Sequence, residues 1–393
     1  MSESVITGRE QNVFVVGHMN PDTDSICSAI AYADLKCKMT GKKYTPKRAG
    51  QLSPETEFVL KHFGVKTPGF ISDVREQVKD MEIRVVPTLS KEMSLKAAWD
   101  VMDKETLSTL PILDEDKCLK GLISVADIAK SYMNVYDSEI LAKAETPYRN
   151  ILEVLEGSMV VGNPDDCVTS GKVLIGAAKP EMMENFVEEG DIVIVGDRYE
   201  AQLCAIEMKA KCVVVCTGAN VAKTITRMAE QRGCAIIQTK YDTFIASRLI
   251  NQSMPIDFFM RKEGFVTFTT EDFLDDIKSV MAEKRHRDFP ILDKDGHYIG
   301  MISRRNLLNV KKKDIILVDH NEVDQAVDGL QSANILEIID HHKIGSLETM
   351  GPVYFRNQPV GCTATIIRQM YRENNIEIEP AIAGLMCSAI LSD

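Results

Sequence analysis

The sequence predicts an α/β protein in which a parallel-sheet domain is split by a long insert. Three short β-branched runs, at residues 13–16, 315–318 and 335–339, each stop at a cluster of Asp and His residues. An internal repeat lies between the first run and the other two, so one sheet has to be formed from both ends of the chain. Ligands of open α/β sheets gather where parallel strands end. We therefore expect the three clusters to meet at one edge of the sheet.

Length, composition and charge restrict the classes of protein to which this chain can belong. At 393 residues the chain is long enough for two to four domains, and 45% hydrophobic residues support packed cores. The formal net charge of −12 excludes a general nucleic-acid surface, which would be basic. No run approaches the ~20 apolar residues of a membrane span, and the start, MSESVITGRE, lacks a secretory pattern. Ten cysteines without CxxC pairs favour the reduced thiols of a cytoplasmic protein.

The first cluster is His18-x3-Asp22-x-Asp24, directly after the run at 13–16. We expect Asp24 or Ser25 to cap a helix that continues through Lys38 and stops at Gly41. Carboxylates with an imidazole and no thiolate favour Mn²⁺, Co²⁺ or Mg²⁺ over structural zinc. An isolated Asp-x-Asp is more often a helix cap and a turn, so this pair becomes a metal candidate only together with the other clusters.

The other two clusters are Asp319-His320-Asn321-Glu322 and Asp340-His341-His342. Two metals ~3.5–4 Å apart can clamp both sides of an in-line displacement and activate a bridging water. A bridge requires a carboxylate with two available oxygens, and Asp319 is our candidate. We expect His341 to bind metal, and His342, facing the other way, to donate a hydrogen bond or proton to a phosphate oxygen. The clusters together predict a phosphoryl-transfer hydrolase.

The insert contains two copies of one pattern, at residues 81–130 and 258–309. Pro111–Asp114 aligns with Pro290–Asp293, and Gly121–Ser124 with Gly300–Ser303, at one common offset of 179 residues. Each copy predicts helix, strand, turn, strand, helix.

This repeat resembles a pair of CBS domains, which associate in tandem and bind adenine nucleotides. The resemblance implies nucleotide-binding roles for Ser124, Asp127, Ser303, Arg304, Arg305 and Asn306. The family's ribose-contacting acid matches Asp127, whereas Asn306 stands at that place in the second copy, so we expect asymmetric binding. Two alternatives stay open: the serines and Asp127 can simply cap helices, and the arginines can lie on a solvated helix face.

Between the copies, residues 140–250 alternate strand-like and helical runs. Asp197-Arg198, Gln202, Ala205-Ile206-Glu207 and Thr217-Gly218 resemble a DRTGG domain, with Ala219 in place of its final glycine. This resemblance implies a dimer-forming spacer without chemistry of its own.

The motifs GHMNPDTDS, LVDHNE and IIDHHKIG closely resemble the DHH phosphoesterase superfamily and, within it, the family II inorganic pyrophosphatases. The CBS and DRTGG segments resemble the inserts of the nucleotide-regulated subgroup. The resemblance implies hydrolysis of pyrophosphate by a hydroxide bound to two Mn²⁺ or Co²⁺ ions, with Mg²⁺ on the substrate. It implies Asp319 and His342 as catalytic residues, and as metal ligands His18, Asp22, Asp24, Asp319, His341 and Asp393.

The resemblance also implies an organisation and a mode of regulation. We expect the DHH domain at 1–70 and 311–393, the CBS domains at 71–135 and 253–310, and the DRTGG domain at 136–252. Asp393 completes the last metal motif where the sequence stops, so we expect truncation before the basic substrate domain. AMP and ADP are expected to inhibit and ATP or diadenosine polyphosphates to activate a cytoplasmic homodimer, with no nucleic-acid or membrane partner.

Two other functions stay open. The same dinuclear core would serve a phosphodiesterase acting on short oligonucleotides or cyclic dinucleotides. The CBS pair would also suit a non-catalytic adenylate sensor, although such a sensor has no need for the metal ligands.

Overall fold

The computed structural model describes residues 5–6, 12–133 and 137–393. The expected boundary at 135/136 and most of the N-terminal segment inspected for a secretory signal lie outside these residues. Two compact units are present. The first comprises Val85–Thr267 and Asp288–Met301, and the second comprises Val5–Arg84, Phe268–Arg287 and Ile302–Asp393.

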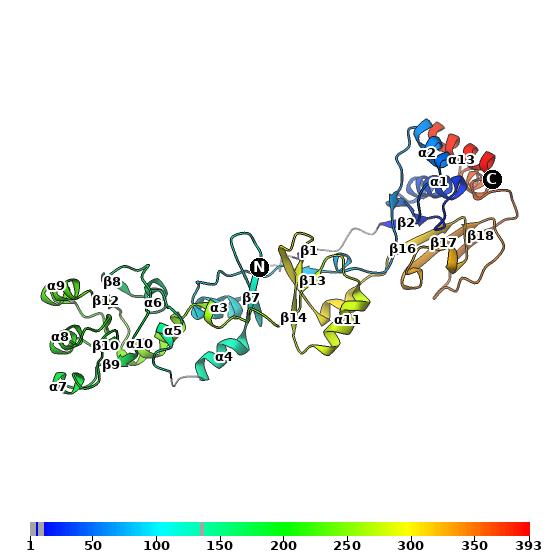
Figure 1. Ribbon diagram of the computed structural model, residues 1–393. Helices are drawn as coiled ribbons and strands as arrows, with labels where there is room; N and C mark the ends of the chain where they lie inside the picture. Colours follow the sequence, from blue (N-terminus) through cyan, green and yellow to red (C-terminus); the bar gives the residue numbers. More distant parts are fainter. Residues whose placement is uncertain (1–4, 7–11, 134–136) are drawn as a thin grey trace. The chain divides into compact units, whose positions relative to one another are not determined.

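The second unit contains a six-stranded sheet in the order β18-β17-β16-β2-β3-β4, and every pairing in it is parallel (Figure 1). Its strands are β2 (Val13–Val16), β3 (Tyr44–Arg48), β4 (Gly69–Phe70), β16 (Asp314–Val318), β17 (Asn334–Asp340) and β18 (Tyr354–Asn357). At the centre, Ile315 of β16 pairs with Phe14 of β2. The predicted parallel-sheet domain split by an insert is therefore confirmed.

Alternating side chains of the central strands enter two different cores. Val15, Ile316 and Val318 pack with the helices of this unit, whereas Phe14 and Leu317 pack with the segments on the other face. The helices are α1 (Thr23–Thr40), α2 (Pro54–His62), α12 (Thr363–Glu373) and α13 (Pro380–Ser392). The short segments of this domain include the 3₁₀ turns η5 (Val323–Gln325) and η6 (Leu330–Ser332). A strand apolar on both faces is what a sheet covered on both sides requires.

The start of α1 differs from the sequence prediction. The N-cap is Asp22, whose Oδ1 accepts a hydrogen bond from the Ser25 amide at 2.8 Å, so the prediction of Asp24 or Ser25 was wrong. The helix ends at Thr40, two residues after Lys38, and Gly41 caps it in the left-handed conformation with φ of 69°. Because Asp22 caps the helix, Asp24 lies buried in the first turn.

The first unit contains a five-stranded sheet in the order β8-β12-β11-β10-β9, parallel except for β8 (Figure 1). The strands are β8 (Ser158–Val161), β9 (Val173–Ile175), β10 (Ile192–Val195), β11 (Cys212–Val215) and β12 (Ala235–Gln238). The helices are α5 (Ile140–Lys143), α6 (Tyr148–Val154), α7 (Pro180–Met183), α8 (Tyr199–Glu207), α9 (Lys223–Arg232) and α10 (Thr243–Leu249). The 3₁₀ turns η2 (Ile250–Ser253) and η3 (Ile256–Phe258) follow. The predicted strand–helix alternation is confirmed.

Polar residues of the DRTGG-like motif bind backbone in this unit. Arg198 donates to the carbonyls of Gly176, Ala177 and Ala178 at 3.0–3.2 Å. Gln202 donates to the Gly196 carbonyl at 3.2 Å. These side chains fix the loops at the ends of β9 and β10.

The two copies of the repeat differ in their last element. The first copy contains α3 (Leu95–Lys104), β6 (Thr109–Leu113), β7 (Leu119–Ser124) and α4 (Val125–Met133). The second contains α11 (Leu274–Glu283), β14 (Asp288–Leu292), β15 (Tyr298–Ser303) and the 3₁₀ helix η4 (Arg304–Asn309). The helix predicted at the end of each copy is present, as an α-helix in the first copy and as a 3₁₀ helix in the second.

The remaining short elements are β1 (Val5–Ile6), η1 (Val78–Asp80), β5 (Ile83–Arg84) and β13 (Phe268–Thr269). Among the described residues, no helix combines the length and apolar character needed to cross a membrane.

Candidate metal centre

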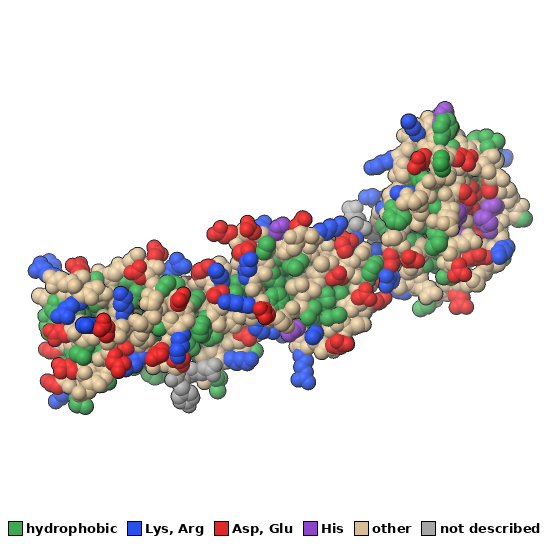
Figure 2. Space-filling model, viewed as in Figure 1, with side chains coloured by type: hydrophobic (Ala, Val, Ile, Leu, Met, Phe, Trp, Pro, Cys, Tyr) green, Lys and Arg blue, Asp and Glu red, His purple; other side chains and the backbone are tan. Residues whose placement is uncertain are grey.

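The three Asp and His clusters meet at the carboxyl ends of β2, β16 and β17. His18 Nε2 lies 3.4 Å from Asp319 Oδ2 and 3.6 Å from Asp22 Oδ2. His341 Nε2 lies 3.4 Å from Asp319 Oδ1 and 3.6 Å from Asp393 Oδ2. Figure 2 shows histidine and acidic side chains gathered on one part of the second unit.

The side chains form two ligand groups that share Asp319. We name His18, Asp22 and Asp319 Oδ2 the first metal group, and Asp24, His341, Asp393 and Asp319 Oδ1 the second metal group. Possible ligand atoms lie within 4.8 Å of one another among His18, Asp22 and Asp319, and likewise among Asp24, His341 and Asp393. Because its two oxygens face different imidazoles, Asp319 has the arrangement of a bridging carboxylate. Asp22 and Asp24, although only two residues apart, belong to different groups.

Close packing of backbone holds the first metal group. The His18 amide donates to Ser25 Oγ at 3.1 Å. A Cβ added at Gly17 would lie 2.0 Å from the same Ser25 oxygen, so only glycine lets the end of β2 approach α1 this closely. These contacts fix His18, after the end of β2, close to Asp22, at the start of α1.

Asp319 is held in an unusual backbone conformation. Its φ is 64°, in the left-handed region that Asp tolerates better than most residues. Its amide donates to the Ile339 carbonyl at 2.9 Å, and its side chain is buried. Outliers of this kind are typical of functional sites.

The amino-terminal end of α12 binds the carboxylate of Asp24. The amides of Thr363 and Ala364 donate to its two oxygens at 2.6 and 3.0 Å, and Ser28 Oγ donates to Oδ1 at 2.9 Å. Thr363 Oγ1 also donates to Asp319 Oδ1 at 3.0 Å. The sequence motifs did not indicate Thr363, because no spacing or residue pattern links it to the Asp and His clusters.

The two adjacent histidines are oriented by different acceptors. His341 Nδ1 lies 3.1 Å from the Val360 carbonyl, which leaves Nε2 as its ligand atom. His342 Nδ1 lies 2.8 Å from Asp340 Oδ1. The two rings lie 4.1 Å apart between centroids, with an angle of 52° between their planes. Half of the His342 side chain is exposed.

Asp340 and Asn321 organise the loop that carries His342. Asp340 is completely buried and accepts bonds from the amides of His341 and His342 and from Asn321 Nδ2. Asn321 also binds the Lys343 carbonyl and accepts from the Gly345 amide. A Cβ at Gly345 would lie 2.8 Å from the Asn321 carbonyl oxygen, which explains the glycine. Asp340 and Asn321 are part of the sequence motifs, but their role in positioning this loop was not predicted.

His320 has a different place. It is buried, with Nδ1 2.9 Å from the Val318 carbonyl, and burial lowers its pKa. It belongs to neither metal group.

The protonation of the centre fits a cation site. Burial alone would lower the pKa of His18, but contact with the carboxylates of Asp22 and Asp319 outweighs it and raises the pKa to about 9. The Asp319 carboxylate likewise raises the pKa of His341 to about 9. Burial and repulsion from Asp319 raise the pKa of Asp24 to about 7. Buried carboxylates that repel one another, with imidazoles and no thiolate in either group, suit hard divalent cations.

Comparisons with known proteins identify the family. The chain is 41% identical over 381 residues to the cobalt-dependent inorganic pyrophosphatase of Clostridium perfringens, which covers 97% of this chain and 69% of the relative. The chain belongs to the family II inorganic pyrophosphatases. It is also 36% identical over 384 residues to a probable manganese-dependent inorganic pyrophosphatase of Thermotoga maritima, covering 98% and 70% of the two chains.

The insert of this pyrophosphatase family member matches two domain families. CBS domains match residues 78–134 and 256–313, and the DRTGG domain matches residues 150–253. A crystal structure of the CBS and DRTGG domains of the Clostridium perfringens pyrophosphatase, complexed with its activator diadenosine tetraphosphate, is 36% identical with a TM-score of 0.56. The match covers 58% of this chain and 100% of the chain in that crystal structure.

The predicted nucleotide residues of both CBS copies form equivalent caps. In the first unit, Asp127 Oδ2 accepts from the Ser124 amide at 2.9 Å and from Ser124 Oγ at 2.5 Å. In the second unit, Asn306 Oδ1 accepts from the Ser303 amide at 2.9 Å and from Ser303 Oγ at 2.8 Å. The capping alternative thus describes both junctions. The two caps differ in charge, because Asp127 is a carboxylate whereas Asn306 is a neutral amide. In the first copy Arg261 Nε lies 3.4 Å from Asp127 Oδ2.

Arg304 closes the end of a helix. Its guanidinium donates to the carbonyl of Met281, to that of Lys284 and, at 2.9 Å, to that of His286, around the carboxyl end of α11. Side chains at this end of a helix satisfy its last carbonyls. Arg305 therefore remains the better candidate for phosphate contact in this copy.

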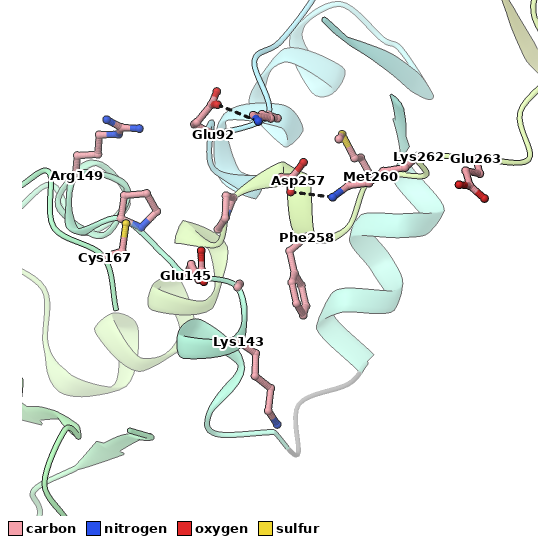
Figure 3. Close-up of a pocket in the computed structure, with 14 residues that line it drawn as sticks. Glu92, Lys143, Glu145, Arg149, Cys167, Asp257, Phe258, Met260, Lys262 and Glu263 are labelled. Atoms are coloured by element: carbon pink, nitrogen blue, oxygen red, sulfur yellow. Dashed lines mark hydrogen bonds and ion pairs between the residues drawn. The ribbon is translucent and has the colours of Figure 1, made fainter. Parts of the chain in front are cut away.

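A pocket of 720 Å³ in the first unit carries no comparable chemistry (Figure 3). Its lining mixes four basic and four acidic side chains with Phe258. Lys262 pairs with Asp257 at 2.9 Å, and Lys143 pairs with Asp137 at 2.6 Å. These charges neutralise one another and do not converge on one point.

Proposed function

We propose that the chain hydrolyses inorganic pyrophosphate to two phosphates with two Mn²⁺ or Co²⁺ ions held by the two metal groups. The observation that carries this proposal is the placement of Asp319, whose two oxygens face His18 and His341 at 3.4 Å each. The similarity to cobalt- and manganese-dependent pyrophosphatases supports the choice of substrate and metal. The proposed DHH domain comprises residues 1–70 and 311–393.

The residues have distinct roles in the proposed reaction. Asp319 holds both metal groups at a fixed separation, while His18, Asp22, Asp24, His341 and Asp393 complete the ligand set. Divalent cations in this site would supply Lewis acidity and lower the pKa of water. The exposed ring of His342, held by Asp340, donates a hydrogen bond to a phosphate oxygen of the substrate. Mg²⁺ on the substrate reduces the negative charge that this acidic chain has to accept.

Regulation by adenine nucleotides is the second part of the proposal. The related regulatory region from Clostridium perfringens binds diadenosine tetraphosphate as an activator. In this chain, Asp127 at the start of α4 offers a carboxylate to ribose hydroxyls, and amides at a helix start favour phosphate. AMP and ADP are proposed to inhibit, and ATP or diadenosine polyphosphates to activate. We further propose a cytoplasmic homodimer, which sedimentation velocity and cell fractionation test.

The decisive experiment compares substrates on the full chain loaded with Mn²⁺. Phosphate release from magnesium pyrophosphate is measured beside nucleotide release from a dinucleotide, with Asp319→Asn as the matched control. We expect phosphate release from pyrophosphate that exceeds the control and requires Mn²⁺ or Co²⁺. Preferential cleavage of the dinucleotide would establish the phosphodiesterase instead. Nucleotide binding without either reaction would establish the adenylate sensor.

A further inference from the structure

We infer that Thr363 is a positioning residue that joins the two carboxylates of the second metal group and sets the affinity of that group for its cation. The inference rests on the proposed metal centre and adds a residue outside the ligand set.

Thr363 makes two different bonds to two ligands that are distant in sequence. Its amide donates to Asp24 Oδ2 at 2.6 Å, and its hydroxyl donates to Asp319 Oδ1 at 3.0 Å. Asp24 precedes the insert and Asp319 follows it. Thr363 is completely buried, so water does not compete for either bond. One residue therefore fixes the spacing between carboxylates from the two parts of the split domain.

The two bonds oppose an electrostatic strain. Asp24 and Asp319 are both buried, with exposed fractions of 2% and 1%. Two buried carboxylates repel each other strongly because the local dielectric constant is low. Donors placed on both carboxylates compensate part of that repulsion before a cation arrives. The hydroxyl also fixes the plane of the Asp319 carboxylate, whose backbone already lies in the left-handed region. The ligands are thus preorganised.

The effect is directed at the second metal group. Thr363 binds Asp319 Oδ1, the oxygen that faces His341 Nε2 at 3.4 Å. The first metal group uses the other oxygen and is held separately, since Ser25 supplies bonds to His18 and Asp22. Loss of the Thr363 hydroxyl should consequently weaken one cation site more than the other.

A purely structural role makes a different prediction. Thr363 begins α12, and a threonine there could serve only to start the helix. Its hydroxyl, however, reaches a ligand 44 residues away in sequence. A helix-starting role would lower stability without separating the affinities of the two cation sites.

The test measures Mn²⁺ binding to the full metal-free chain by calorimetry, and follows the spin coupling of the Mn²⁺ pair by electron paramagnetic resonance. Thr363→Val removes the hydroxyl at nearly constant volume and Thr363→Ser retains it. Thr365→Val makes the same change two residues later on α12, where the hydroxyl faces Cys362 Sγ at 3.3 Å. Loss of a hydrogen-bond partner behind a metal ligand costs about 10- to 100-fold in metal affinity.

We expect Thr363→Val to weaken one Mn²⁺ site by about 10- to 100-fold and to reduce the spin-coupled signal. Thr363→Ser and Thr365→Val should match the unchanged chain. Two unchanged sites in Thr363→Val, or equal weakening of both, would overturn the inference. If Thr363→Val does not fold by circular dichroism, Thr363→Ala, which adds no apolar bulk, replaces it with the same expectation. Failure of the unchanged chain to bind two Mn²⁺ ions would instead overturn the proposed metal centre.

Discussion

The protonation of His18 and His341 sets the pH dependence of cation binding. Both imidazoles have a pKa of about 9 in the metal-free chain, so both carry a proton at pH 7 that a cation has to displace. The affinity for Mn²⁺ should therefore rise as the pH increases from 6 to 9, and binding at pH 7 should release protons. Calorimetry in two buffers of different ionisation enthalpy measures this release. An affinity that stays constant over this range would contradict the raised pKa values.

The second prediction at this scale concerns the charge of Asp127. Asn306 makes the same two bonds to its serine that Asp127 makes, so Asp127→Asn should keep the cap and remove only the charge. Because hydrogen bonds to charged groups contribute about 1.5–3 kcal/mol, AMP affinity should fall about tenfold or more. Calorimetric titration with AMP measures it. Asp116→Asn, on an exposed turn of the same copy, is the control and should leave the affinity unchanged. Equal affinities would leave Asp127 with a capping role alone.

Residue types explain which part of the site the sequence could predict. His18, Asp22 and Asp319 follow strand ends, and parallel strands bring their carboxyl ends to one edge. Thr363 acts through hydrogen bonds to the ligands Asp24 and Asp319, and Asn321 through bonds to Asp340 and the loop after it. Threonine and asparagine occur throughout the chain, so residue type alone does not reveal these roles. Their partners are fixed only when α12 and the loop after β17 are packed. Asp22 was predictable as a turn residue but not as the N-cap of α1, where its Oδ1 accepts from the Ser25 amide.

At the scale of elements, α13 is stabilised through one face. Leu385 is completely buried against the core shared with α1, whereas Leu391 on the same helix is 87% exposed. Leu385→Ala should cost about 2–5 kcal/mol in local stability because it leaves a cavity, and Leu391→Ala should change it by less than about 0.5 kcal/mol. Hydrogen–deuterium exchange of α13 peptides reports this difference within the second unit. Equal exchange in both variants would show that α13 does not depend on this core.

Elements were predictable where periodicity and end signals agreed. The strand β2 is an uninterrupted apolar run, β16 is apolar after Asp314, and β17 is apolar at its centre except for Glu337, and Gly41 ends α1 as predicted. The helix at the end of the second CBS copy was predicted from the repeat, but the repeat did not predict that it is a 3₁₀ helix. A repeat transfers strand positions well, because the strands are buried in both copies. It does not determine the type of the terminal helix, which is α in the first copy and 3₁₀ in the second.

At the scale of the whole molecule, the insert divides the ligands of one metal centre. His18, Asp22 and Asp24 precede it, and Asp319, His341 and Asp393 follow it. A nucleotide that changes the insert can therefore act on the centre through two chain junctions. Such an effect requires that the nucleotide bind two states with different affinities. The proposed nucleotide-binding insert is thus linked at both of its ends to the domain that holds the metal ligands.

Linkage gives this arrangement a test that does not depend on turnover. If AMP changes the affinity for Mn²⁺ by some factor, Mn²⁺ has to change the affinity for AMP by the same factor. Typical coupling of about 1–3 kcal/mol corresponds to about 5- to 150-fold. AMP titrations of the full chain with and without saturating Mn²⁺, paired with Mn²⁺ titrations with and without AMP, close the cycle.

We expect the two affinities to change by the same factor, and this factor to differ from one. AMP as an inhibitor should weaken Mn²⁺ binding or oppose the catalytic arrangement of the centre. Both factors equal to one, with both ligands bound, would show that the insert does not communicate with cation binding. Nucleotide regulation would then have to act on the substrate rather than on the metal groups.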